Sequence, residues 1–234
     1  ALGITTAAGS AGQVVGPPLA ASLLAVMPWA SVFVIFAVIS LVTIILVPFL
    51  KSQPQDSKKN IQQDNLSDAL FQALKDPTYI MLFLGFFSCG FQLAFITAHF
   101  PAFIAESSSP IIEGSLISLV CNSVESLGAL SIALIGLFNI IGSITAGALG
   151  KNFTKKYLLS IIYSGRTIAA ILFIILPITP ITVTIFSVVM GALWLATVPL
   201  TSGIIAYIYG LKFMGTLYGI VFLSHQIGSF VGVW

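Results

Sequence analysis

One charged residue lies in the middle of a long apolar stretch. Residues 157–176 form a run of 20 in which Arg166 is the only charged side chain. A helix of that length spans about 30 Å, the thickness of the hydrocarbon core of a bilayer. An Arg at the midplane costs roughly 2.5–3.5 kcal/mol to insert, so such a charge usually faces a partner, a cavity or a ligand. Helical spacing places Tyr163, Thr167 and Ala170 on the same face, which predicts a polar stripe beside it.

Two roles for Arg166 follow from its chemistry. A guanidinium recognises a carboxylate with paired hydrogen bonds, so Arg166 and Tyr163 are candidate ligands of an anionic substrate. The alternative is a permanent ion pair with an acidic residue beyond this sequence, because no Asp or Glu lies inside an apolar stretch of this chain.

Five further polar residues lie in apolar stretches. His225 titrates near pH 6.5 when unperturbed and is a candidate for carrying a coupling proton. His99 lies near the end of its stretch and is a candidate gating residue, as is Gln226. Gln92 and Asn139 are candidate substrate ligands. The alternative for His99 is an ordinary histidine at the membrane interface. The alternative for the other four is hydrogen bonding between helices, which in membranes contributes only about 0.6 kcal/mol on average.

The composition excludes an ordinary soluble domain. Of the 234 residues, 58% are hydrophobic and 7% are charged, whereas soluble domains carry about 25% charged residues. We therefore expect an all-α, polytopic membrane protein. The two cysteines, Cys89 and Cys121, form no disulfide framework and are interpreted as free thiols. No basic patch of the kind that binds nucleic acid is present.

The apolar pattern predicts seven transmembrane spans and the connections between them. The spans are residues 1–26, 31–50, 78–105, 131–149, 157–176, 181–208 and 215–234. Residues 106–130 are expected to form a long, partly polar loop and residues 150–156 a short basic loop. Pro17 and Pro199 are expected to break or kink their spans.

The lysines support this assignment. Residues 51–76, 150–156 and 210–214 hold all eight lysines, and the alternate connections hold none. By the positive-inside rule the first group is cytoplasmic. Residues 51–76 begin as a polar linker, and residues 66–74 have the apolar spacing of an amphipathic helix, with Ser67 as its expected N-cap.

Motifs of membrane enzymes are missing from this sequence. It has no His-Glu-x-x-His, no Gly-x-Ser-x-Gly and no pair of aspartates within a span. We therefore expect neither an enzyme, nor a metal site, nor a bound cofactor.

The first span resembles a known transporter motif. Gly3, Gly12, Gly16-Pro17 and Ala20-Ala21 follow the spacing of the glycine motif in the fifth helix of major facilitator superfamily transporters. In that family the last pair is usually Gly-Gly, and the motif is associated with antiporters. The helix-packing residues implied here are Gly12, Gly16 and Pro17.

The basic loop resembles a second signature of the same superfamily. Gly147, Leu149 and Lys151, followed by Lys155-Lys156, are similar to the G-x-L-a-D-R-x-G-R-K pattern after the eighth helix. Gly150 stands at the aspartate position of the family, which puts the usual charge pairing there in doubt. The resemblance implies that this chain holds helices five to eleven. Residues 1–50 would end the N-terminal bundle, 51–77 would be the linker, and 78–234 would form most of the C-terminal bundle.

A finer resemblance is to the monocarboxylate-porter-like bacterial branch. It rests on four runs, residues 86–101, 136–142, 163–166 and 225–228. It implies a secondary transporter of small organic anions in the bacterial inner membrane, working by alternating access with a coupled proton or counter-anion. A drug or metabolite exporter on the same fold and a non-transporting membrane scaffold remain as alternatives.

Overall fold

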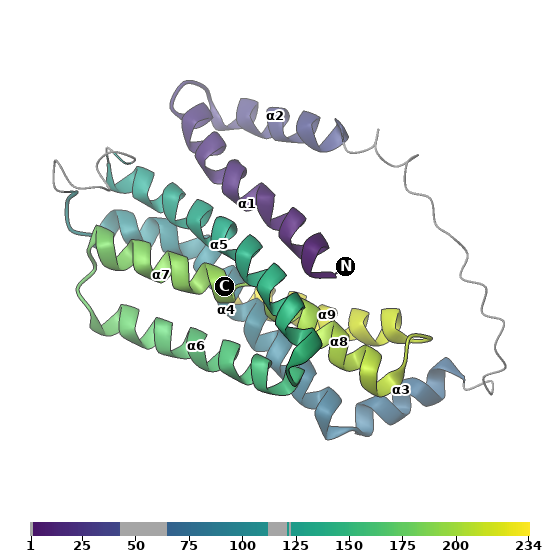
Figure 1. Ribbon diagram of the computed structural model, residues 1–234. Helices are drawn as coiled ribbons and strands as arrows, with labels where there is room; N and C mark the ends of the chain where they lie inside the picture. Colours follow the sequence, from purple (N-terminus) through teal and green to yellow (C-terminus); the bar gives the residue numbers. More distant parts are fainter. Residues whose placement is uncertain (1, 43–64, 112–120, 122) are drawn as a thin grey trace.

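The computed structural model describes residues 2–42, 65–111, 121 and 123–234 (Figure 1). All regular secondary structure within these ranges is helical, which confirms the all-α prediction. The helices are α1 Leu2–Leu24, α2 Trp29–Val42, α3 Leu66–Lys75, α4 Pro77–Ser107, α5 Val124–Asn152, α6 Lys155–Ile175, α7 Pro180–Leu193, α8 Thr197–Tyr209 and α9 Met214–Val233.

Five helical segments among the described residues are long and apolar enough to cross a membrane. They are α4, α5, α6, the α7–α8 pair and α9. Helix α1 has 23 residues and is not one of these five segments. Helix α2 has 14 residues, and the rest of the predicted second span lies outside the described residues. The protein is a multi-pass membrane protein, and the count of seven spans stays a prediction.

Helices α4 and α9 pack with their backbones almost in contact. A Cβ atom added at Gly90 would overlap the carbonyl oxygen of His225, and one added at Gly228 would overlap that of Phe87. Ser224 of α9 donates its hydroxyl to the Phe83 carbonyl at 2.8 Å. Small residues of this kind allow close helix association in lipid. They fix His225 against the middle of α4.

Helix α5 is the centre of the packing (Figure 1). It lies against α1 on one side and against α7 on the other, and it also contacts α4 and α8. A Cβ at Gly136 would stand 2.7 Å from the Gln13 side chain of α1, and one at Gly142 would overlap the Ala192 carbonyl of α7. Helix α5 therefore joins the first described helix to the rest of the bundle.

The span from Pro180 to Tyr209 is broken in the middle. Helix α7 ends at Leu193 and α8 begins at Thr197. The predicted kink at Pro199 was misplaced, because Pro199 lies in the first turn of α8, where a missing N–H is tolerated. The expected break at Pro17 was also wrong, since α1 continues without interruption past that residue.

Two predicted loops are shorter than expected. Helix α4 continues to Ser107, and α5 already begins at Val124, so residues 106–107 and 124–130 of the predicted loop 106–130 are helical. The start of α5 is fixed by a capping box in which Ser123 and Ser126 exchange hydrogen bonds of 3.2 Å. The middle of that loop lies outside the described residues. In the predicted basic loop 150–156, Lys151 belongs to α5 and Lys155 to α6.

The amphipathic helix predicted at residues 66–74 is present as α3. Its N-cap is Asn65 and not Ser67, which lies inside the first turn. Ala73 is fully buried, whereas Phe71 and Leu74 are exposed. The N-terminal part of the predicted linker lies outside the described residues.

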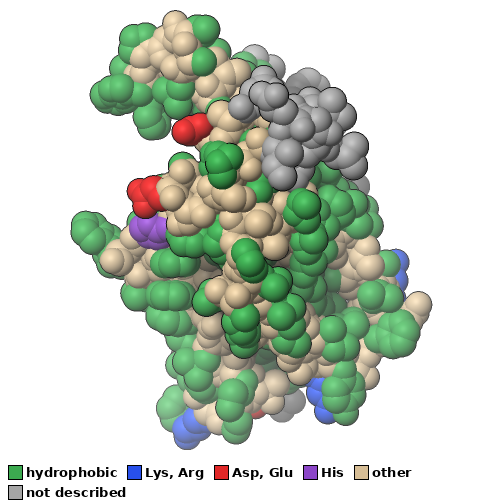
Figure 2. Space-filling model, turned by 90° about the vertical axis from the view of Figure 1, so that its left-hand side faces the viewer, with side chains coloured by type: hydrophobic (Ala, Val, Ile, Leu, Met, Phe, Trp, Pro, Cys, Tyr) green, Lys and Arg blue, Asp and Glu red, His purple; other side chains and the backbone are tan. Residues whose placement is uncertain are grey.

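Hydrophobic side chains cover most of the face shown in Figure 2. The clearly visible acidic side chains lie at its upper left beside a histidine, and basic side chains lie along its lower and right-hand edges. The two kinds of charge are therefore separated by apolar surface on this face, as expected for a chain that passes through a bilayer.

Candidate functional site: a buried polar centre at the α7–α8 break

Arg166 lies inside the bundle and is only 1% exposed. Its Nε and Nη2 donate to the carbonyl oxygen of Leu193 at 2.9 and 2.7 Å, and its Nη1 donates to Cys89 Sγ at 3.1 Å. Leu193 is the last residue of α7, so its carbonyl has no amide of a following helical turn to accept from. Arg166 fills that position. Its guanidinium also lies 5.7 Å from the centre of the Tyr163 ring.

Asn139 of α5 provides a hydrogen-bond partner for the backbone at the α7–α8 break. Its Oδ1 accepts a hydrogen bond from the backbone N–H of Leu195 at 2.9 Å and another from Ser143 Oγ at 3.1 Å. Its Nδ2 donates to Ser10 Oγ of α1 at 2.6 Å. Irregular backbone at membrane depth requires such internal partners, because lipid offers none. Arg166 and Asn139 therefore make the broken span possible.

Cys89 and His225 complete the polar centre. Cys89 is 1% exposed, and its sulfur lies 3.8 Å from Thr197 Oγ1 of α8. The His225 ring is close enough to interact with the Cys89 thiol, although neither ring nitrogen reaches hydrogen-bond geometry with a described residue. Both nitrogens are buried. The ring stacks on Phe222 at 5.5 Å and meets Phe86 edge-on at 5.9 Å.

Two of the predicted site residues lie elsewhere. Gln92 and His99 line a mostly aromatic cavity of about 380 Å³ between α4, α6 and α7. His99 Nε2 lies 3.2 Å from the Val233 carbonyl of α9, while Gln226 is exposed on α9. The structure therefore brings Arg166 together with Tyr163 but leaves Gln92, His99 and Gln226 away from the guanidinium contacts.

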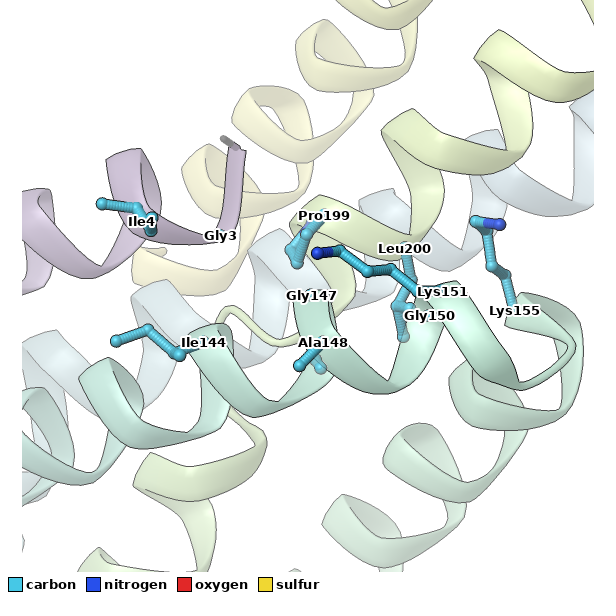
Figure 3. A pocket seen from close by; sticks show the side chains of 11 residues that line it. Gly3, Ile4, Ile144, Gly147, Ala148, Gly150, Lys151, Lys155, Pro199 and Leu200 are labelled. Atoms are coloured by element: carbon cyan, nitrogen blue, oxygen red, sulfur yellow. The ribbon is translucent and has the colours of Figure 1, made fainter.

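The predicted motif residues surround a different cavity (Figure 3). It has a volume of about 480 Å³ and lies where α1, α5 and α8 meet. Figure 3 shows Gly147, Lys151 and Lys155 at this cavity, with Gly3 of α1 opposite. Lys156 does not line it and instead lies over the Tyr157 ring at 5.0 Å.

The glycine motif of α1 has a smaller role among the described helices than its spacing predicts. A Cβ added at Gly12 or Gly16 would meet nothing within 4 Å, whereas one at Gly3 would stand 2.9 Å from the Ser143 carbonyl oxygen. Gly3 therefore makes the close approach to α5 at this end of the helix pair.

Sequence reasoning missed Cys89 and Thr197 as members of the polar centre. The signal was present for Cys89, because it lies as deep in its own span as Arg166 does in its span. Matching the depths of polar and polarisable residues across spans would have paired them. No comparable signal marks Thr197, since the break before it falls in an apolar run.

A second polar contact lies at the end of the bundle that carries α3. Tyr209 of α8 donates its hydroxyl to Asp76, the residue that caps α4. Asp76 also accepts from the backbone N–H of Thr78 at 2.8 Å. The hydrogen bond from Tyr209, and then that from Thr78, hold the pKa of the Asp76 carboxyl below its usual value.

Comparisons with known proteins identify the family. Residues 1–233 match the model of the Major Facilitator Superfamily, and the chain belongs to that superfamily. This is a family of transporters and not of enzymes. The predicted resemblance is therefore confirmed at the level of the superfamily, while the monocarboxylate-porter-like branch stays a prediction.

The chain is similar to one curated protein in particular. It is 27% identical over 245 residues to an uncharacterized MFS-type transporter, YcxA, of Bacillus subtilis (strain 168). The match covers 100% of this chain and 55% of the relative, so the chain spans about half of the length of that protein. No solved structure matches the chain.

Proposed function

We propose that the protein is a secondary active transporter of small organic anions, with monocarboxylates as the preferred class, in the bacterial inner membrane. Residues 1–50 would belong to its N-terminal bundle and residues 78–234 to its C-terminal bundle. The two bundles would rock around a central site in alternating access. Membership of a transporter superfamily supports the general activity.

The observation that carries the substrate class is the state of Arg166. Its side chain is buried, and the contacts of the described residues use three of its five N–H donors. Those contacts go to a carbonyl oxygen and a sulfur, and none goes to a carboxylate. An Arg stays protonated in proteins, so its charge and remaining donors favour an anionic ligand. Tyr163 would flank that ligand.

Coupling would involve a proton or a counter-anion. His225 supports the proton, because an imidazole ring can carry one and both of its ring nitrogens are buried without a hydrogen-bond partner among the described residues. The predicted roles in transport of four further residues stay predictions, and the same transport assay tests them. These residues are Asn139, Gln92, His99 and Gln226.

Uptake into proteoliposomes tests the proposal. The full-length protein is reconstituted and the initial rate of uptake of a labelled monocarboxylate is measured. We expect Arg166→Ala to lower the rate at least about tenfold, equivalent to about 1.4 kcal/mol of lost stabilisation. Thr167→Ala is the matched control, since Thr167 is exposed on the same helix and bonds only to the Tyr163 carbonyl. Normal uptake by folded Arg166→Ala would contradict the assignment.

One observation favours an exporter of drugs or other apolar metabolites instead. The cavity of about 380 Å³ beside Gln92 and His99 is lined largely by phenylalanines, which suits a lipophilic ligand. The glycine motif of α1 also favours antiport. A substrate panel that compares carboxylates with lipophilic cations separates the two functions, because a midplane cation at Arg166 disfavours cationic cargo.

A further inference from the structure

Arg166 presents a charge problem that its hydrogen bonds do not solve. The chain has seven acidic residues, and all of them lie outside the middle of the spans. A buried charge without a counter-charge is strongly unfavourable, and an Arg cannot lose its proton to relieve this. Carbonyl contacts such as those with Leu193 satisfy donors but leave the net charge in place.

We propose that Cys89 is held as a thiolate and is the counter-anion of Arg166, and that Cys89 and His225 together form a proton-binding site. The sulfur lies 3.1 Å from Arg166 Nη1, at direct hydrogen-bond distance. Both side chains are 1% exposed, so water does not screen the pair. Thiols beside Arg or a protonated His ionise more readily than free thiols.

The groups around the sulfur match this charge state. Helix α6 presents Arg166 and Tyr163, α9 presents His225 and Tyr218, and α8 presents the hydroxyl of Thr197. Helix α7 has no ionisable side chain, and those of α5 lie at its two ends, Glu125 and Lys151. No described carboxylate therefore competes with Cys89 for the guanidinium at this depth.

Protonation of this site changes the charge that Arg166 presents. When the Cys89 thiolate accepts one proton from solution, either directly or through His225 as a relay that is itself reprotonated and then released, it becomes a neutral thiol and an S–H bond forms. The guanidinium then carries an uncompensated positive charge. On the proposed function, on which this step rests, the protonated state is the one that attracts the anionic substrate, so proton and anion bind together.

Infrared spectroscopy tests the thiolate directly. The S–H stretching band lies in a window with little other protein absorption, and a thiolate does not give it. The difference spectrum of the full-length protein minus Cys89→Ser in lipid vesicles isolates Cys89. We expect no S–H band for Cys89 at neutral pH and its appearance on acidification. A Cys89 S–H band at neutral pH would overturn the proposal.

Three variants make the result specific. Cys121 is the matched control, because it is also a buried free cysteine but, unlike Cys89, makes no hydrogen bond with a described Arg, so the difference spectrum with Cys121→Ser should show an S–H band at neutral pH. In Arg166→Gln the Cys89 band should appear at neutral pH, whereas Arg166→Lys should keep it absent. A thiolate that persists in folded Arg166→Gln would exclude Arg166 as its counter-ion and overturn the pairing. If Arg166→Gln does not fold, the wild-type and Arg166→Lys spectra decide.

Uptake measurements separate this inference from the transport proposal. In Cys89→Ser, a hydroxyl replaces the thiol and stays neutral, so the pH dependence of anion uptake should flatten. Failure of the wild-type protein to transport any tested anion would refute the proposed function and leave the spectroscopic result standing. Conversely, a normal pH profile in Cys89→Ser would refute a role of Cys89 in coupling.

Discussion

Asn139 and Arg166 contact the same helix break from opposite sides and differ in what they leave unsatisfied. Asn139 is neutral, its carbonyl oxygen accepts two hydrogen bonds, and its amide nitrogen donates one. Arg166 also satisfies backbone, at Leu193, but it keeps a full charge and unused donors. The helix break is therefore supported by two different groups. The hydrogen bonds of Asn139 are nearly all made, whereas Arg166 can still respond to a ligand or a proton.

The largest effect should come from removing the packing that holds the break against α5. In Gly142→Val the new Cβ would overlap the Ala192 carbonyl, so the helices must separate and the Asn139 contacts break with them. We expect a loss of about 3 kcal/mol or more in the free energy of unfolding, at the upper end of overpacking effects. The measurement is the unfolding midpoint in detergent. Gly219→Val is the control, because nothing lies within 4 Å of its added Cβ.

Asn139→Ala should lower the free energy of unfolding by about 2–3 kcal/mol, because in a dry interior it leaves the Leu195 N–H without its acceptor and removes the donor to the Ser10 oxygen. Unfolding of the purified variant measures this. Thr145→Ala on the same helix, where an exposed hydroxyl bonds only to Ile141 of its own helix, should change stability by less than about 0.5 kcal/mol. If folded Asn139→Ala were as stable as wild type and lost only transport, the contrast with Arg166 would be wrong.

Whereas Asn139→Ala should mainly lower the stability of the fold, Arg166→Lys should mainly lower the rate of anion uptake. Lys keeps the charge but loses the fork geometry with which Nε and Nη2 meet the Leu193 carbonyl. We expect a loss of about 1 kcal/mol in stability and a larger loss in the rate of anion uptake. Both quantities are to be measured on one preparation. A pure backbone cap would give the stability loss with an unchanged uptake rate.

The smallest effect should come from the partly buried contact between Asp76 and Tyr209. The folded-state pKa of Asp76 is lowered, so this contact stabilises the fold above the unfolded-state pKa of about 3.9 and the contribution is lost as pH falls through the folded-state pKa. In Tyr209→Phe the acid-induced loss should be smaller, by less than about 1 kcal/mol because solvent still screens the carboxylate. Unfolding midpoints of both proteins between neutral and acidic pH measure it. An unchanged acid profile in Tyr209→Phe would show that Thr78 alone lowers the pKa.

The sequence predicts the fold class better than it predicts the site. Apolar runs and the distribution of lysines are local signals, and they indicated the membrane helices. The resemblance of the first span and of the basic loop to known motifs indicated the superfamily. The helix break carries no such signal, because Trp194, Leu195 and Ala196 are apolar residues that fit a continuous span. The contacts of Arg166 with Leu193 and Cys89 join residues far apart in the chain, and periodicity within one helix cannot reveal them.

Even so, the spacing of Tyr163 and Arg166 on one helical face correctly indicated that the two side chains meet. Asn139 was identified as a polar residue inside a span, but its bonds to α1 and to the break depend on three helices that meet only in the fold. Gln92 was grouped with Arg166 because both are polar and lie within spans, and depth alone does not distinguish the faces on which they lie.

The break between α7 and α8 also divides one helix macrodipole into two. The carbonyl end of α7, at Leu193, carries partial negative charge and faces Arg166, while the amide end of α8, at Thr197, carries partial positive charge and lies beside Cys89. Each half-helix therefore ends at the buried centre with a partial charge that is favourable for the side chain next to it. An unbroken span would place both ends at the membrane surfaces, about 15 Å or more from these side chains. The missing turn thus brings partial charges of both signs to the buried centre, without any acidic residue.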